Sequence, residues 1–323
     1  TGDGDDTIVV DGDADGAGAS AAITVGNDMA ESVINFGDGS NTLVLDNDNA
    51  TGHDLGAVTF EGSLDTIRFD SGATGGATIN GMAFDGSDVE IDVFGTATNT
   101  NFIVELNEDQ GTDLSGITFN GFTQAGATIN APAGDEDNVI TGSDGKDIIT
   151  GGDGDDEISG GANDDTITGG AGADTLDGGD GSDTFDFDIG AANLVGEANL
   201  TSVTDFDAND ASEDFQFGTD AGDIFGGLTA TSVSVNPAET IGSPSTDVNN
   251  ITDLASELTA ITASGTGTLE AKVVDVDDSD SGLDGQTFLY LNDTTGGASA
   301  TDDIFIDITG VDGTIAMTDF SFV

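Results

Sequence analysis

A nine-residue repeat occupies residues 142–186 without interruption. Its five copies read GSDGKDIIT, GGDGDDEIS, GGANDDTIT, GGAGADTLD and GGDGSDTFD, and a degenerate copy, AGDEDNVIT, precedes them from Ala133. Glycine at the first two positions permits the backbone conformations with positive φ that a tight turn needs. The apolar residue at every eighth position indicates a short strand whose side chain enters a core. Copies this regular predict a repetitive β architecture over residues 133–187, which we call the repeat block.

The repeats also carry a regular pattern of acids. The sixth position holds Asn138, Asp147, Asp156, Asp165, Asp174 and Asp183. The third position holds Asp135, Asp144, Asp153 and Asp180 in four of the copies. Together with the glycines, this pattern resembles the calcium-binding nonapeptide of repeats-in-toxin (RTX) proteins.

The resemblance implies a right-handed parallel β-solenoid, or β-roll, in which two nonapeptides form one coil. Equivalent turns would then stack from coil to coil with several Ca²⁺ ions between them. In each turn the backbone carbonyls point inward and the sixth-position side chain closes on the same ion. The third-position acids are expected either to bind ions or to face water.

The charge of the chain points independently to bound cations. Lys and Arg number 3 against 64 Asp and Glu, for a formal net charge of −61. A compact chain with that charge repels itself, so it must either stay disordered or take up cations. Disorder accompanies few apolar residues, whereas 36% of these residues are hydrophobic. The charge also disfavours nucleic acid and anionic lipid as partners.

The available ligands narrow the choice of cation. The chain has no Cys and one His, so thiolate sites are excluded and imidazole-rich zinc or iron sites are disfavoured. The remaining donors are almost all oxygens, which suit a hard cation, and Ca²⁺ above all.

Residues 1–132 resemble a looser version of the same architecture. Residues 1–9 fit the nonapeptide from its second position, with Asp6 in the ligand place and Ile8 in the core place. Residues 37–44 fit again, with Asn41 in the ligand place. Short β-rich phrases separated by Gly, Asn and Asp follow. Their spacing is also compatible with a β-sandwich, but continuity into the repeat block favours one irregular parallel solenoid.

The nine-residue repeat ends at Asp186. Residues 188–323, which we call the cap, are expected to be non-repetitive and mostly β. Apolar residues on one face predict a short helix near residues 251–261, and strands are predicted over 269–276, 287–291 and 303–309. A solenoid ends in an exposed strand edge that must be covered, and this segment is placed to cover it.

The repeat block and the hydrophobic C-terminus together resemble proteins exported by type I secretion, which include proteases, lipases, adhesins, toxins and S-layer proteins. The family's uncleaved C-terminal signal is similar to residues 319–323, DFSFV. The resemblance implies export of an unfolded chain that folds on extracellular calcium. The sequence contains no run of about 18 apolar residues, the length that a membrane-spanning helix needs.

Two functions remain open at this point. The first is a structural subunit of an S-layer or similar surface sheet or filament, which associates with itself. The second is the C-terminal calcium-binding and secretion module of a larger adhesin or exoenzyme, which the start of the chain within a repeat-like phrase favours. Catalysis is not expected, because His53 is the single imidazole and no G-x-S-x-G or H-E-x-x-H motif occurs.

Overall fold

The computed structural model describes residues 7–11, 32–35, 40–46, 53–55, 58–61, 64–69, 77–80, 89–93, 102–105, 112–113, 117–120, 126–131, 137–187, 200–210, 212–217, 232–241, 253–254, 268–277, 283–292 and 304–322. The chain divides into two compact units, whose residue ranges alternate along the sequence of the repeat block. The first comprises residues 1–133, 138–150 and 160–165, and the second comprises 134–137, 151–159 and 166–323. Each unit is described by itself.

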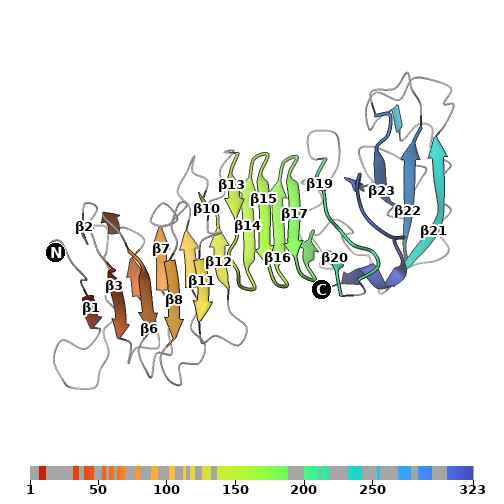
Figure 1. Cartoon of the computed structure of the whole chain (residues 1–323). Coiled ribbons are helices and arrows are strands. Elements are labelled where there is room, and N and C mark those ends of the chain that lie inside the picture. Colours follow the sequence, from red (N-terminus) through yellow and green to blue (C-terminus); the bar gives the residue numbers. More distant parts are fainter. Residues whose placement is uncertain are drawn as a thin grey trace. The chain divides into compact units, whose positions relative to one another are not determined.

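Parallel strands build the first unit (Figure 1). One sheet has the order β1 (Thr7–Asp11), β3 (Thr42–Asp46), β6 (Thr66–Phe69), β8 (Val89–Val93), β11 (Ile117–Asn120). A second parallel series runs through β4 (His53–Leu55), β7 (Ala77–Asn80), β9 (Phe102–Glu105), β12 (Ala127–Asn130) and the start of β14 (Ile148–Asp153). Shorter parallel pairs join β2 (Ser32–Asn35) to β5 (Val58–Glu61) and β10 (Thr112–Asp113) to β13 (Val139–Thr141).

The pairing pattern identifies a solenoid. Strand β7 pairs with β9, whereas β8, which lies between them in sequence, pairs with β6 and β11. Successive strands therefore alternate between sheets, as they do when each coil contributes one strand to each sheet. A β-sandwich would require antiparallel pairs, whereas the strand pairs described in residues 1–132 are parallel, as a parallel solenoid requires.

Strands of the repeat block begin at the seventh position of a nonapeptide: β14, β15 (Glu157–Ala162), β16 (Thr166–Ala171), β17 (Thr175–Asp180) and β18 (Thr184–Asp186). All six eighth-position side chains are at most 1% exposed, namely Ile140, Ile149, Ile158, Ile167, Leu176 and Phe185. The seventh-position residues Val139 and Ile148 are 56% and 54% exposed. The predicted inward position is therefore confirmed, and its neighbour points outward as the period of a strand requires.

In the second unit the roll continues beyond the last nonapeptide. Strand β17 pairs in parallel with β19 (Ser202–Val203), and β18 with β20 (Asp214–Phe217). The C-terminal end of the chain then comes back to this sheet, because β25 (Phe320–Phe322) pairs in parallel with β20. Phe206 stacks on Phe215 with ring centroids 4.1 Å apart. The ring centroids of Phe320 and Phe215 are 6.0 Å apart. The last strand thus covers an apolar edge of this unit.

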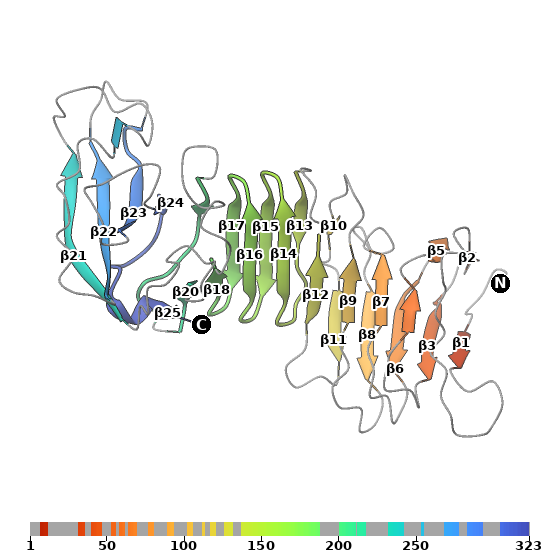
Figure 2. The same ribbon diagram turned by 180° about the vertical axis from the view of Figure 1, so that it is seen from behind.

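A mixed sheet completes the second unit (Figure 2). Its order continues from β19 through β24 (Ile304–Asp307), β23 (Thr287–Asn292), β22 (Thr268–Val276) and β21 (Ser232–Ile241). The β22–β23 and β23–β24 pairs are antiparallel, and β21 pairs with β22 in parallel. A short 3-10 helix, η5 (Met317–Asp319), precedes β25. All three strands predicted in the cap are present, with ends shifted by a few residues.

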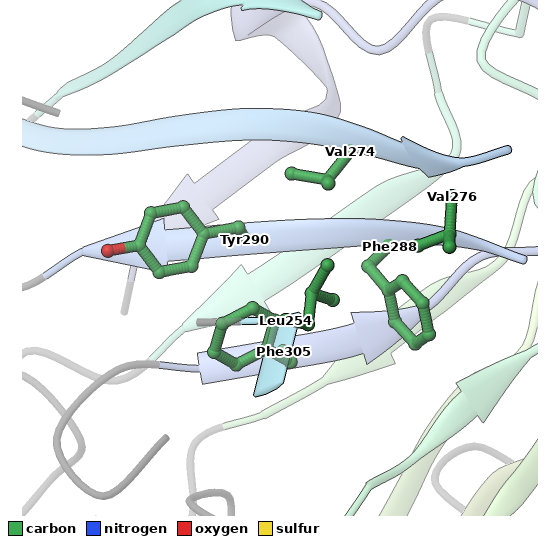
Figure 3. Close-up of a cluster of buried hydrophobic side chains, with 6 residues drawn as sticks. All are labelled: Leu254, Val274, Val276, Phe288, Tyr290 and Phe305. Atoms are coloured by element: carbon green, nitrogen blue, oxygen red, sulfur yellow. The ribbon is translucent and has the colours of Figure 1, made fainter. Parts of the chain in front are cut away.

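The predicted helix near residues 251–261 is described only at Asp253 and Leu254, which are helical. Leu254 is buried with Val274, Val276, Phe288, Tyr290 and Phe305 (Figure 3). This cluster gives the mixed sheet an apolar core, and none of its described members is a carboxylate. None of the described helical residues belongs to a helix long and apolar enough to cross a bilayer.

Candidate functional site

Burial separates the two sets of acids in the repeats. All six sixth-position side chains are at most 2% exposed: Asn138, Asp147, Asp156, Asp165, Asp174 and Asp183. At the third position, Asp144 and Asp180 are exposed and Asp153 is half-buried. Asp6 and Asp135, the remaining sequence-predicted ligands, lie outside the described residues. The structure therefore places the sixth position inside the turns and the described third-position acids nearer to water.

The sixth-position residues connect one coil to the next. The backbone N–H of Asp147 donates to Asp165 Oδ1 at 2.7 Å, and that of Asp156 donates to Asp174 Oδ1 at 3.1 Å. The partners in both bonds are 18 residues apart, which is two nonapeptides. We call a series of sixth-position side chains joined in this way a carboxylate ladder. Each ladder holds buried carboxylates one coil apart.

Backbone carbonyls approach the same carboxylates. A Cβ atom added at Gly151 would meet both Asp156 Oδ2 and the carbonyl oxygen of Gly169. At Gly142 it would meet Asp147 Oδ2 and the carbonyl oxygen of Gly160. The first-position glycines are therefore required because the carboxylate of the same repeat and a carbonyl of the next coil fill the place of a side chain. The turns present closely spaced, hard oxygen ligands.

The electrostatics of these ladders favour a bound cation at neutral pH. Burial raises the pKa of Asp147 to about 6 from an ordinary 3.8, although N–H groups of Ser143 and Ala127 donate to its carboxylate and lower it. Burial raises the pKa of Asp174 to about 6 as well. Asp174 Oδ2 is buried without a hydrogen-bond partner. A buried carboxylate must be paired, bound to a metal or protonated, and a divalent cation in the turns would let these groups stay ionised at neutral pH.

No cationic side chain in the described repeat block serves that purpose. Lys146 is its one basic residue, and it forms an ion pair with Asp164 on the outer, exposed part of the turns. Nor do three His, Cys, Asp or Glu side chains converge anywhere among the described residues. An ion in these turns would therefore take carboxylate oxygens from the ladder and most other ligands from backbone carbonyls. Calcium accepts six to eight oxygen ligands of these kinds in flexible geometry, so the donor set fits calcium.

Ladder positions also occur where the sequence pattern did not identify them. Asp65 lies one coil after the buried Asn41, because Thr42 pairs with Thr66, and the N–H of Asn41 donates to Asp65 Oδ2 at 2.7 Å. This is the same bond as in the repeat block. The residues Asp65-Thr66-Ile67 repeat the phrase Asp165-Thr166-Ile167, which was the available signal for this position.

Glu213 occupies a similar place after the last nonapeptide. Thr184 and Phe185 pair with Asp214 and Phe215, which puts Glu213 beside Asp183, and it is only 4% exposed. Burial raises its pKa to about 7, the N–H of Asp207 lowers it, and the carboxylates of Asp183, Asp205 and Asp207 raise it further. A buried acid therefore follows Asp183 although no repeat is present there.

Comparison with known proteins agrees with this geometry. The chain matches a family model described as "RTX calcium-binding nonapeptide repeat (4 copies)" over residues 132–167 and 159–192. Comparisons with curated proteins and with solved structures give no match. Residues 132–192 are thus RTX repeats, as the nonapeptide pattern predicted, and such repeats bind Ca²⁺. Proteins that carry them are typically secreted.

The raised pKa values predict an unusual pH dependence for the metal-free protein. Between the ordinary pKa near 4 and the raised values near 6 to 7, the folded state holds more protons than the unfolded state. The free energy of unfolding therefore increases as pH falls through this window. For Asp147 the shift from 3.8 to about 6 corresponds to about 3 kcal/mol.

We expect chelated protein to gain β-sheet circular dichroism between pH 7 and pH 5, with light scattering recorded to exclude aggregation. The variant Asp147→Asn lacks the titrating group and should show a smaller gain. The matched control Asp180→Asn, at an exposed third position, should retain the full gain, because Asp180 does not contribute to the raised pKa of Asp147. A β-sheet signal that declines between pH 7 and pH 5 would contradict the prediction.

Proposed function

We propose that this protein is an extracellular structural protein, a subunit of an S-layer or similar surface sheet or filament, folded and assembled by Ca²⁺. The observation that carries the proposal is the pair of interactions that align buried carboxylates one coil apart, Asp147 with Asp165 and Asp156 with Asp174. At neutral pH, where these carboxylates are largely ionised, a cation between the turns would stabilise such ladders. The metal is then part of the folded structure.

Calcium availability supports an extracellular site of action. Extracellular calcium modules bind with dissociation constants of about 10⁻⁴–10⁻³ M, far above cytosolic calcium. At a calcium concentration about 100 times the dissociation constant, each independent site contributes about 2.7 kcal/mol. Several sites therefore supply stability comparable to the roughly 5–15 kcal/mol of a whole domain. The chain would stay unfolded during export and fold outside.

The outer surface of the same turns supports assembly. Asp137, Asp144, Asp155, Asp164 and Asp180 are exposed in the repeat block. The backbone N–H of Asp155 donates to Asp137 Oδ1 at 2.9 Å, 18 residues away, so exposed acids recur at the spacing of the coils. Two such acidic surfaces repel each other unless cations bridge them. Calcium at the concentration that folds each subunit would also join subunits.

Export by type I secretion agrees with the composition of the C-terminus. A short, mostly hydrophobic segment follows Asp319. In the folded protein this segment forms β25, which pairs with β20. A segment read by the transporter in the unfolded chain would become the last strand after export. We propose no catalytic activity, since no nucleophile–base motif occurs in the sequence.

The test of this proposal is circular dichroism combined with light scattering while calcium is titrated into chelated full-length chain. We expect a cooperative gain of β-sheet signal near millimolar calcium, followed by growth of large ordered particles visible by electron microscopy. A folded monomer that never grows would overturn the assembly proposal and leave the calcium-dependent fold intact.

A second candidate function is the C-terminal calcium-binding and secretion module of a larger adhesin or exoenzyme. The observation that favours it is the non-repetitive cap, in which the C-terminal strand closes an apolar edge with Phe320 against Phe215 and Phe217. A module of this kind needs no contact between copies. The mass of the native, full-length protein distinguishes the two functions, because a much heavier parent with another domain would favour the module.

A further inference from the structure

Thr201 occupies the sixth-position place of a coil that lies outside the nonapeptide repeats. Thr175 and Leu176 pair in register with Ser202 and Val203. Val203 is fully buried, as Leu176 is, so it takes the eighth position. The residue two places earlier, Thr201, then stands one coil after Asp174.

The backbone repeats the same bond at both coils. The N–H of Thr175 donates to the carbonyl oxygen of Asp156 at 2.7 Å, and the N–H of Ser202 donates to that of Asp174 at 2.7 Å. Asp156, Asp174 and Thr201 therefore occupy equivalent places in successive coils, and the ladder bond itself joins Asp156 to Asp174. Thr201 carries a hydroxyl where the repeats carry a carboxylate.

Two buried oxygens at these places have no hydrogen-bond partner. Asp174 and Thr201 are each 2% exposed. Asp174 Oδ1 accepts from the N–H of Asp156, whereas Asp174 Oδ2 and Thr201 Oγ1 are both buried without a partner. The Thr201 hydroxyl is near enough to the Asp174 carboxylate for a contact of the hydrogen-bonding kind to lower the pKa of Asp174, although the two oxygens do not meet the geometry of a good hydrogen bond. Proteins rarely leave two buried oxygens so poorly paired side by side.

We propose that Thr201 is a calcium ligand and that, with Asp174, it closes a further calcium site between the last coil of this ladder and the non-repetitive segment. Hydroxyl and carboxylate oxygens are both hard ligands, and backbone carbonyls or waters complete calcium coordination. Because the hydroxyl is neutral, this site carries less negative charge than one between two aspartates, and it should be the weaker. The proposal rests on calcium binding by the roll and is independent of assembly.

The alternative is a threonine that is merely buried, and two substitutions separate it from a ligand. Thr201→Val keeps the shape and removes the oxygen. Removing the hydroxyl can lower stability in either case, because it takes away the Thr201 contact with the Asp174 carboxylate. A merely buried threonine, however, predicts an unchanged number of bound calcium ions. A ligand predicts the loss of one bound ion. Thr201→Asp places the repeat's own ligand at this position, so at a calcium site it should lower the calcium concentration at the folding midpoint. At a site without metal, the same substitution would add a second buried charge beside Asp174 and raise that concentration.

The experiment counts calcium ions on the full chain by native mass spectrometry at saturating calcium and measures the folding midpoint by circular dichroism. We expect one calcium fewer in Thr201→Val, the wild-type count in Thr201→Ser, and a lower midpoint in Thr201→Asp. Thr204→Val is the matched control, because the Thr204 hydroxyl already donates to the Leu176 carbonyl at 3.1 Å, and its ion count should not change.

Thr201→Val with the wild-type ion count, together with a raised midpoint in Thr201→Asp, would overturn the proposed site. If the wild-type chain bound no calcium at all, calcium binding by the repeats would fail first and this site with it. A wild-type chain that binds calcium without assembling would leave the Thr201 site unaffected, so the two proposals fail separately.

Discussion

Gly170→Ala is expected to destabilise the calcium-loaded protein by at least about 3 kcal/mol, through strain at a positive-φ position and overlap with the neighbouring coil. Gly170 has φ +118°, a conformation that residues with a side chain rarely adopt. A Cβ atom there would overlap the carbonyl oxygen of Gly152, which belongs to the backbone of an adjacent coil and cannot rotate away. Either the turn or the stacking of the coils must give way.

The matched control is Gly285→Ala. Gly285 also has a positive φ, of 80°, but no atom lies within 4 Å of its added Cβ. This substitution should cost only the conformational strain, about 1 kcal/mol. Urea unfolding of both variants in saturating calcium measures the difference. Equal losses for the two would mean that the close approach of the coils at Gly170 contributes nothing to stability.

The regular part of this fold could be predicted from the sequence because its period is local. Ile149, Ile158 and Ile167 recur every nine residues, and their burial follows from that spacing alone. The cap strands were predictable from local composition, because β22 and β23 are rich in β-branched and aromatic residues such as Val273, Val274 and Phe288. Local composition determines these elements.

Ladder positions outside the repeats were not predictable in this way, because coil length varies there while strand register does not. Asp147 and Asp165 are 18 residues apart, whereas Asn41 and Asp65, which form the same bond, are 24 apart. A search at a fixed period therefore misses Asp65. It misses Thr201 too, and there the residue type also differs from the motif.

The pairing of the C-terminal strand β25 with β20 is a further feature that local sequence patterns cannot predict. Ser321 Oγ donates to Asp214 Oδ2 across 107 residues of chain, beside the pairing of β25 with β20. The sequence suggested only an export signal in this segment. What selects its position is an apolar edge that includes Phe215 and Phe217, and this edge exists only after the roll has folded.

Removal of calcium is expected to unfold the repeat block while the mixed sheet of the cap persists. In the repeat block, the buried carboxylates of each ladder lose the cation that offsets their desolvation and mutual repulsion. In the cap, β22 and β23 pack around Val274, Phe288 and Tyr290, and its described core contains no carboxylate. The hydrophobic stabilisation of that sheet does not depend on a metal.

Hydrogen–deuterium exchange with peptide-level resolution measures this difference on the full chain at pH 7. Chelation should abolish amide protection over residues 137–187 and leave most of the protection over 268–277 and 283–292. Calcium added back should restore the first region. Magnesium at the same concentration should not, because it requires a small, near-octahedral site and releases its waters reluctantly.

The outcome decides what holds the coils together. Persistent protection of residues 137–187 without calcium would mean that backbone pairing and the eighth-position core suffice, and that the raised pKa values of Asp147 and Asp174 are tolerated without a metal. Loss of protection in both regions would mean that the cap depends on the roll for its own stability. Selective loss in the repeat block would show that calcium is the partner of the buried carboxylates and that the apolar stack alone cannot compensate for their charge.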